Sequence, residues 1–252
     1  MKANSSPQIV VRLLSALKGF FTFKELEKLL GVPLQMLWRY TSLQAVPERT
    51  TANRIMQRIE DLRLIEKILD EVIKVNKYGF IETWRYSSNI YVLNILGYLA
   101  HEFVANDDID VVLAVSEEAL PIATVIADWI KANVCSTSRE LCLNIEKYLV
   151  DFYPSSTLKR IVPLLVPRDL LSPNTEVLLV DDLVNTGASL NAALRLIRSA
   201  HAKPWGVFAV VSLNTGWLSR LREMGVNHIY VARDLSNAGI HFGRLVTNLS
   251  AR

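Results

Sequence analysis

Residues 177–189 constrain the fold of this chain more than any other stretch. Four apolar residues open the stretch, and two adjacent carboxylates, Asp181 and Asp182, follow them. A short polar turn with one glycine then leads into an Ala- and Leu-rich run that ends near Ala200. This order predicts a buried parallel strand, a tight loop and the start of a helix.

The predicted loop has the chemistry to hold a phosphorylated sugar. Backbone N–H groups at a helix N-terminus bind phosphate, and nearby hydroxyls add hydrogen bonds. Carboxylates at the end of the strand can accept hydrogen bonds from the vicinal hydroxyls of a ribose. The alternative is an aspartate pair that is merely solvated, but adjacent carboxylates repel unless a ligand or metal uses them. The candidate ligand-binding residues here are Asp181, Asp182, Val184, Asn185, Thr186, Gly187, Ala188 and Ser189.

The stretch Val-Leu-Leu-Val-Asp-Asp-Leu-Val-Asn-Thr-Gly-Ala-Ser resembles the signature of type I phosphoribosyltransferases. That signature consists of two hydrophobic residues, Asp-Asp, three variable residues, and Thr-Gly-x-Ser/Thr. The resemblance implies that phosphoribosyl pyrophosphate (PRPP) binds here, usually with Mg²⁺.

The same resemblance places residues 115–121 where the family has its pyrophosphate loop. Small residues, usually including glycine, let backbone amides approach the pyrophosphate there. This chain has no glycine in that segment, and its carboxylates would repel a pyrophosphate. One of them, Glu118, could instead help to hold Mg²⁺. The candidate ligand-binding residues of this segment are Ser116, Glu117 and Glu118.

The composition limits the class of protein. A chain of 252 residues that is 50% hydrophobic has the length for one or two domains with a real core. No apolar run is long enough to span a bilayer, and residues 1–8 lack a signal-peptide pattern, so a cytoplasmic location and no membrane partner are expected. The two cysteines, Cys135 and Cys142, lack metal-ligand spacing and are expected to be free buried thiols.

Positive charge gathers in the first part of the chain. Residues 1–77 carry 13 Lys and Arg against 8 Asp and Glu, a net +5, whereas residues 78–252 carry 15 against 17, a net −2. This asymmetry favours a polyanionic partner for the N-terminal segment.

That basic segment shows the periodicity of short helices. A helical stripe covers residues 7–17, and Thr22 with Glu25 has the spacing of a capping box before a second helix. Gly31 suits a helix end and Pro33 suits a helix start. The expected elements are helices over residues 7–17, 23–30 and 33–40, a fourth from Thr50, and a long amphipathic helix over residues 60–77.

Two short helices joined by Leu-Gly-Val-Pro have the layout of a helix-turn-helix, and residues 8–62 resemble the lambda repressor and Cro-like DNA-binding domain. The resemblance implies a double-stranded DNA operator read by residues 33–40. Glutamine can read adenine, and arginine can read guanine or hold phosphate. Trp38 is expected in the core, and the alternative is a helical dimerisation or protein-docking domain. The candidate DNA-binding residues are Pro33, Leu34, Gln35, Arg39, Arg49, Thr50 and Arg54.

Beyond residue 78, strands and helices alternate, which predicts a doubly wound parallel sheet with ligands at the carboxyl ends of its strands. A mobile lid is expected around residues 151–160, where Lys159 and Arg160 either neutralise pyrophosphate or serve solubility. Strands are expected over residues 109–115, 141–153, 158–166, 177–180, 205–212 and 226–232, with helices over 90–104, 121–131 and 215–224.

These features predict an α/β chain with an all-helical helix-turn-helix domain over residues 1–77 and a phosphoribosyltransferase fold over residues 78–252. The expected function is a DNA-binding transcription regulator, not an enzyme, that senses PRPP or a related nucleotide. Operator symmetry favours a homodimer formed through the second domain. One alternative is an active phosphoribosyltransferase for orotate or a purine base. The absence of glycine from the pyrophosphate loop argues against this alternative. The other is a structural protein in which both motifs are relics.

Overall fold

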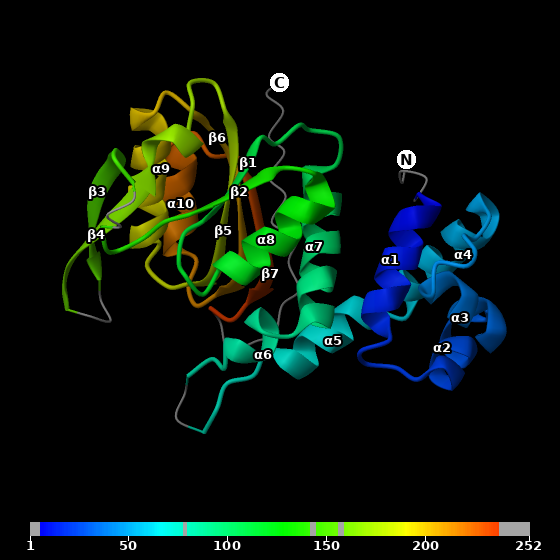
Figure 1. Cartoon of the computed structure of the whole chain (residues 1–252). Coiled ribbons are helices and arrows are strands. Elements are labelled where there is room, and N and C mark those ends of the chain that lie inside the picture. The colour runs from blue at the N-terminus through cyan, green and yellow to red at the C-terminus, as the bar shows by residue number, and fades with distance from the viewer. Residues whose placement is uncertain (1–5, 78–79, 142–144, 156–158, 237–252) are drawn as a thin grey trace, which may run out of the picture. The chain divides into compact units, whose positions relative to one another are not determined.

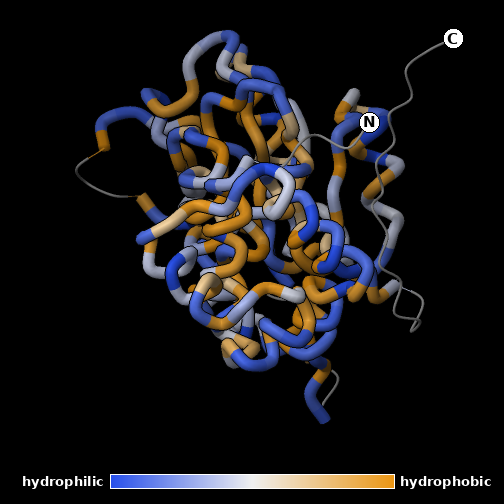
Figure 2. Tube along the Cα trace, turned by 90° about the vertical axis from the view of Figure 1, so that its right-hand side faces the viewer, coloured by the Kyte–Doolittle hydropathy of each residue, from blue (hydrophilic) through white to orange (hydrophobic). Residues whose placement is uncertain are grey.

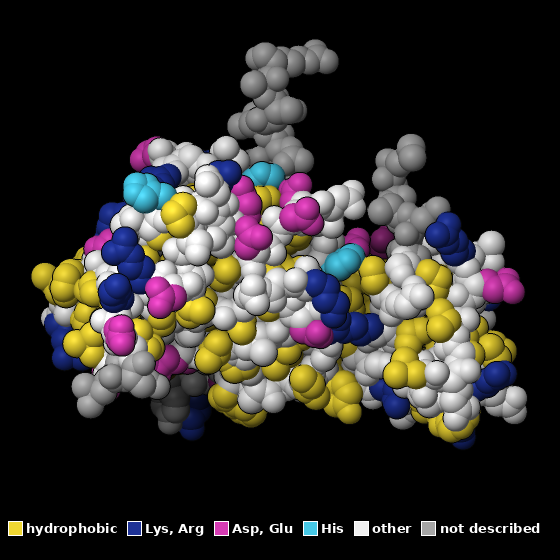
Figure 3. All heavy atoms as spheres, turned by 45° about the horizontal axis from the view of Figure 1, so that its top comes forward, with side chains coloured by type: hydrophobic (Ala, Val, Ile, Leu, Met, Phe, Trp, Pro, Cys, Tyr) yellow, Lys and Arg dark blue, Asp and Glu magenta, His cyan; other side chains and the backbone are white. Residues whose placement is uncertain are grey.

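The computed structural model describes residues 6–77, 80–141, 145–155 and 159–236. The chain divides into two compact units, Met1–Tyr98 and Leu99–Arg252. The domain boundary expected after residue 77 stays a prediction. Among the described residues, no helix combines the length and hydropathy needed to cross a membrane. Figure 3 shows charges of both signs mixed with hydrophobic side chains on one face of the molecule.

The first unit is helical, as its periodicity predicts. Helices α1 and α2 both pack against α3 and α4, and α4 also contacts α5. Hydrophobic and hydrophilic residues alternate along these helical segments (Figure 2), so each helix buries one stripe. The helices are α1 (Pro7–Leu17), α2 (Phe23–Leu30), α3 (Leu34–Thr41), α4 (Arg49–Asp61), α5 (Leu64–Val72), α6 (Trp84–Ser87) and α7 (Ile90–Val104), the last of which continues into the second unit.

The predicted capping box at the start of α2 is confirmed. The backbone N–H of Glu25 donates to Thr22 Oγ1 over 3.3 Å, and the N–H of Thr22 donates to a carboxylate oxygen of Glu25 over 2.8 Å. These bonds to Thr22 lower the pKa of Glu25. Gly31 ends α2 with a φ of +66°, a left-handed conformation that glycine adopts without strain.

The single long helix expected over residues 60–77 is wrong. Arg63 has a φ of +52°, and this left-handed residue separates α4 from α5. The break turns the chain so that Ile59 of α4 and Ile68 of α5 are both buried. After α5 the backbone becomes extended, and Val75 pairs with Ile81 in an antiparallel bridge.

The second unit contains a five-stranded parallel sheet in the order β2-β1-β5-β6-β7. Figure 1 shows α9 and α10 on one side of this sheet and α8 on the other, which confirms the doubly wound prediction. The strands are β1 (Val111–Ala114), β2 (Asn133–Ser136), β5 (Glu176–Val184), β6 (Lys203–Ser212) and β7 (His228–Asp234), and the helices are α8 (Leu120–Ile130), α9 (Ala188–Ser199) and α10 (Gly216–Glu223).

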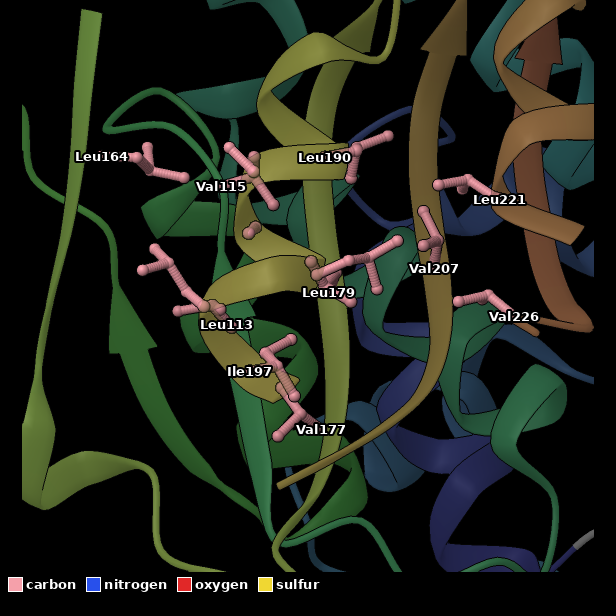
Figure 4. Close-up of a cluster of buried hydrophobic side chains, with 14 of the residues drawn as sticks. Leu113, Val115, Leu164, Val177, Leu179, Leu190, Ile197, Val207, Leu221 and Val226 are labelled. Atoms are coloured by element: carbon pink, nitrogen blue, oxygen red, sulfur yellow. The ribbon is translucent and has the colours of Figure 1, made fainter. Parts of the chain in front are cut away.

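The core of this unit forms where α9 and α10 cover the sheet. Leu113, Leu179 and Val207 from three strands pack with Ile197 of α9 and Leu221 of α10 (Figure 4), and each is fully buried. Strands buried on both faces have nearly continuous apolar runs, as β1, β5 and β6 do.

Two strands differ from the sequence expectation. Strand β2 was not predicted, because four residues without an apolar pattern give no periodic signal, and it forms by parallel pairing of Val134 with Val112. It buries the free thiol of Cys135, and burial raises the pKa of that thiol to about 12. Cys142 lies outside the described residues.

The two strands expected over residues 141–153 and 158–166 are confirmed, although the first begins at Tyr148 rather than at Leu141. Strands β3 (Tyr148–Ser155) and β4 (Arg160–Pro167) pair antiparallel in a separate sheet, followed by a short 3-10 turn, η1 (Arg168–Leu170). The hairpin packs on α9, where Arg195 Nε donates to a carboxylate oxygen of Asp151 over 2.6 Å. Residues 156–158 lie outside the described residues, so the lid expected around residues 151–160 stays a prediction.

Candidate functional site

The strand order reverses between β1 and β5, and ligands bind such open sheets outside the carboxyl ends of the strands at this point. The N–H of Val115, just after β1, donates to the carbonyl of Val180 in β5 over 2.9 Å. The two segments singled out in the sequence, residues 116–118 and 181–189, therefore leave the sheet side by side. The sequence alone predicted each segment, and the topology brings them together.

The acidic pair is buried at this edge. Asp181 and Asp182 are 4% and 7% exposed, and β5 continues past them to Val184. Ser116 Oγ donates to Asp182 Oδ1 over 3.0 Å, which joins the β1 loop to the pair. The sequence did not indicate this bond, because its partners are 66 residues apart.

Burial raises the pKa of both aspartates. For Asp181 the pKa rises well above its usual value, first because burial disfavours the charge and next because Asp182 and then Glu118 repel it. For Asp182, burial raises the pKa, the hydroxyl of Ser116 opposes the rise, and Glu118 adds to it. A buried pair of this kind favours a ligand that supplies hydrogen-bond donors, as the vicinal hydroxyls of a ribose do.

The loop from β5 to α9 leads into the N-terminus of a helix. Asn185 and Thr186 are exposed, and Gly187 starts the helix with a φ of +70°. Thr186 Oγ1 accepts from the N–H of Ala188 over 3.4 Å. The first N–H groups of α9 have no partner within the helix, and together with the helix dipole they favour a phosphate.

The loop after β6 supports the loop from β5 to α9 through hydrogen bonds. Sequence reasoning missed this supporting loop. Trp217 Nε1 donates to Ser212 Oγ over 3.0 Å, and Ser212 Oγ donates to the carbonyl of Asn214 over 2.7 Å. Asn214 Nδ2 in turn donates to Asn185 Oδ1 over 3.0 Å. The available signal was the polar run Ser-Leu-Asn-Thr-Gly after the predicted strand over residues 205–212, which ends at the same edge of the sheet.

The family model for the phosphoribosyl transferase domain matches residues 92–222, just over half of the chain. The chain belongs to the phosphoribosyltransferase domain family. Its fold agrees, since the adenine phosphoribosyltransferase of Rhodothermus marinus superposes with a TM-score of 0.59 at 18% identity, covering 69% of this chain and 99% of that one.

Two curated relatives of this phosphoribosyltransferase-domain chain differ in kind. A xanthine phosphoribosyltransferase of Laribacter hongkongensis is 22% identical over 193 residues, which cover 71% of this chain and 98% of that protein. A probable purine biosynthesis transcriptional regulator, PurR, of Streptococcus pneumoniae is 24% identical over 152 residues, 60% of this chain. The match spans 54% of that regulator, about half of its length. The relatives of this chain thus include both enzymes and regulators.

The structure places the loop after β1 of this phosphoribosyltransferase domain beside the acidic pair, as expected. Glu117 and Glu118 are exposed there, and Glu118 lies close enough to raise the pKa of both aspartates. Within the described ranges, no group of three or more His, Cys, Asp or Glu side chains is placed to hold a metal ion. The described carboxylates therefore do not fit a Mg²⁺ site formed by the protein alone.

The helix-turn-helix candidates lie in two groups on the first unit. In α3, Gln35 and Arg39 are exposed and Leu34 is half-buried, while the N–H of Leu34 donates to Glu27 Oε1 of α2 over 3.0 Å and so fixes the start of the helix. Pro33, at the N-cap of α3, is exposed. The second group, in the first turns of α4, consists of the exposed residues Arg49, Thr50 and Arg54.

The expectation that Trp38 belongs to the core is wrong, because its side chain is 48% exposed. Leu37 and Tyr40 supply the buried side of α3. Residues three and four apart lie on one helix face, so Trp38 shares the exposed face of α3 with Gln35 and Arg39.

Proposed function

We propose that this chain is a DNA-binding transcription regulator whose phosphoribosyltransferase domain binds PRPP or a related 5′-phosphorylated ribosyl compound. The observation that carries the proposal is the phosphate loop beside the buried Asp181–Asp182 pair, in a chain that also has a helix-turn-helix layout in α2 and α3. The PurR relative, named as a purine biosynthesis transcriptional regulator, supports this combination. A homodimer follows from the symmetry of operators. Mg²⁺ would enter bound to the phosphates of the ligand.

The proposed regulator does not transfer the phosphoribosyl group. Its pyrophosphate loop carries Glu117 and Glu118 in place of the small residues that let backbone amides approach a pyrophosphate, and their charges repel one. A second candidate, an active phosphoribosyltransferase, is favoured by the xanthine phosphoribosyltransferase relative. Pyrophosphate release from PRPP in the presence of orotate, xanthine, guanine or adenine would establish the enzyme.

Ligand binding can control DNA affinity only if the ligand binds two states of the protein unequally. The same coupling free energy then makes DNA change the affinity for the ligand by an equal factor. The proposal thus requires that DNA and the phosphoribosyl ligand shift each other's dissociation constants reciprocally.

We expect the full chain to bind DNA from its own promoter, with an affinity that changes at least fivefold when a phosphoribosyl ligand, either PRPP with Mg²⁺ or a nucleoside 5′-monophosphate, is added. Fluorescence anisotropy of labelled promoter DNA at fixed salt measures this, with unrelated DNA of the same length as the control. Specific binding that ignores PRPP and every nucleoside monophosphate would refute the sensing role. Equal affinity for promoter and unrelated DNA would refute the regulator.

Trp38→Ala is expected to weaken binding to the promoter about tenfold, because the exposed face of α3 loses an apolar contact surface beside Gln35 and Arg39. The matched control is Trp84→Ala, which removes an indole that is 60% exposed elsewhere in the same unit. Anisotropy titrations of both variants check the difference. Equal affinities in the two variants would show that Trp38 does not contact DNA.

A further inference from the structure

In the loop between β1 and α8, backbone N–H groups donate to acceptors of the same loop. This limits the anions that the loop can bind and therefore the ligand of the proposed function. The N–H of Ala119 donates to Ser116 Oγ over 3.0 Å, and the N–H of Leu120 donates to the carbonyl of Glu117 over 3.2 Å. Pro121, in the first turn of α8, has no N–H to donate. The N–H groups of Ala119 and Leu120 are therefore already engaged, and position 121 offers none, at a loop where an anion site requires several amides.

Charge in the same loop also opposes a pyrophosphate. Glu117 and Glu118 are exposed there, and Glu118 lies within electrostatic range of Asp181 and Asp182. An incoming pyrophosphate would meet the carboxylates of this loop, which repel it.

The loop at the other end of the site has the opposite character. Residues 183–199 contain no Asp or Glu, and the segment includes Arg195 and Arg198. The hydroxyls of Thr186 and Ser189 and the amides that follow Ala188 in α9 are suited to one phosphate group, while the N–H of Ala188 donates to Thr186 Oγ1 over 3.4 Å. The site thus combines a phosphate position after β5 with a position after β1 that repels anions.

From this contrast, and resting on the proposed function, we propose that the site selects 5′-phosphorylated ribosyl ligands without a 1-pyrophosphate. Nucleoside 5′-monophosphates and ribose 5-phosphate belong to this class, and PRPP does not. The phosphate binds the loop after β5, the ribose hydroxyls donate to the aspartate pair, and the group on C1 of the sugar faces Glu117 and Glu118.

Ribose 5-phosphate and PRPP differ only in the 1-pyrophosphate, so comparing them isolates this position. Calorimetric titration of the full chain in a chelating buffer is expected to give PRPP a dissociation constant at least tenfold above that of ribose 5-phosphate. Glu117→Gln with Glu118→Gln removes both charges, and we expect it to reduce the ratio of the two constants about tenfold. The matched control is Glu140→Gln with Glu223→Gln, which removes two exposed charges outside this loop and leaves the ratio unchanged.

Three results would overturn the inference. The first is wild-type protein that binds PRPP at least as tightly as ribose 5-phosphate in chelating buffer, and the second is a ratio that the loop variant does not change. The third result concerns Mg²⁺ in place of the chelator. If the wild type then prefers PRPP and the loop variant does not, the two glutamates hold a metal–pyrophosphate instead of repelling it. If neither compound binds at millimolar concentration, the phosphoribosyl site itself fails and the inference with it.

Discussion

Gly187→Ala is expected to lower the free energy of unfolding by about 3–4 kcal/mol, from two sources. Gly187 has a φ of +70°, which costs a residue with a Cβ roughly 1–2 kcal/mol. The new Cβ would also lie 2.6 Å from Cβ of Trp217, a fully buried residue whose indole is held by Ser212. Relieving this contact moves either the loop at the start of α9 or Trp217 at the start of α10, and a shift of the loop should lower the affinity for the phosphate as well.

Gly225→Ala is the matched control for this substitution. Gly225 has a φ of +74°, and no atom lies within 4 Å of the position that its Cβ would occupy. Its cost should be that of the backbone alone, about 1–2 kcal/mol. Urea denaturation of both variants, followed by tryptophan fluorescence, measures the difference. Equal midpoints would show that the contact with Trp217 does not constrain the loop.

Asp181→Asn is expected to stabilise the protein near neutral pH while it weakens the binding of the ribosyl ligand. Burial, and then repulsion by Asp182, hold the pKa of Asp181 well above its usual value near 3.8. Asparagine carries no charge, so its burial beside Asp182 costs less than that of a carboxylate. A residue that costs stability and serves a ligand is common at binding sites.

The sign of the pH dependence follows from the raised pKa. Below the usual carboxyl pKa, the folded and unfolded states both carry the proton on Asp181, and the carboxyl costs no stability. As the pH rises from that value through the raised pKa of the folded state, the unfolded state loses its proton first, so stability falls. The advantage of Asp181→Asn should therefore grow across this window and become constant above it.

Urea denaturation of the wild type and Asp181→Asn at pH values from 4 to 8 tests this dependence, with ligand affinity measured in parallel. The control is Asp108→Asn, at an exposed position of the same unit. A stability difference that stays constant with pH would contradict the raised pKa. Unchanged affinity for ribosyl ligands would remove Asp181 from the binding site.

Much of the candidate site was predictable because its chemistry lies in consecutive residues. The apolar run of β5, the aspartates, Thr186 and Gly187 form a strand, a loop and a helix start within 13 residues, so local rules apply. The capping box of Thr22 and Glu25 and the helix end at Gly31 were predictable for the same reason. The alternation of strands and helices also predicted a parallel sheet, which the order β2-β1-β5-β6-β7 confirms.

Features that depend on distant partners were not predictable. Strand β2 exists because β1 offers it an edge, a pairing that its own four residues do not signal. Trp38 lies on the exposed side of α3 because Leu37 and Tyr40 supply the buried side, a choice that residue type alone does not make. The break at Arg63 likewise lets both flanking helices bury their apolar side chains, whereas the local sequence pattern predicts a continuous helix.

The sequence by itself determined the local elements and the residue types that can hold a phosphorylated ribose, since backbone propensity and short-range spacing decide both. Only the tertiary structure decided which of these residues meet. Ser116 reaches Asp182 because β1 and β5 are neighbours at the point where the strand order reverses. Asn214 reaches Asn185 because β6 ends at the same edge, and such contacts arise from the packing of strands far apart in the chain.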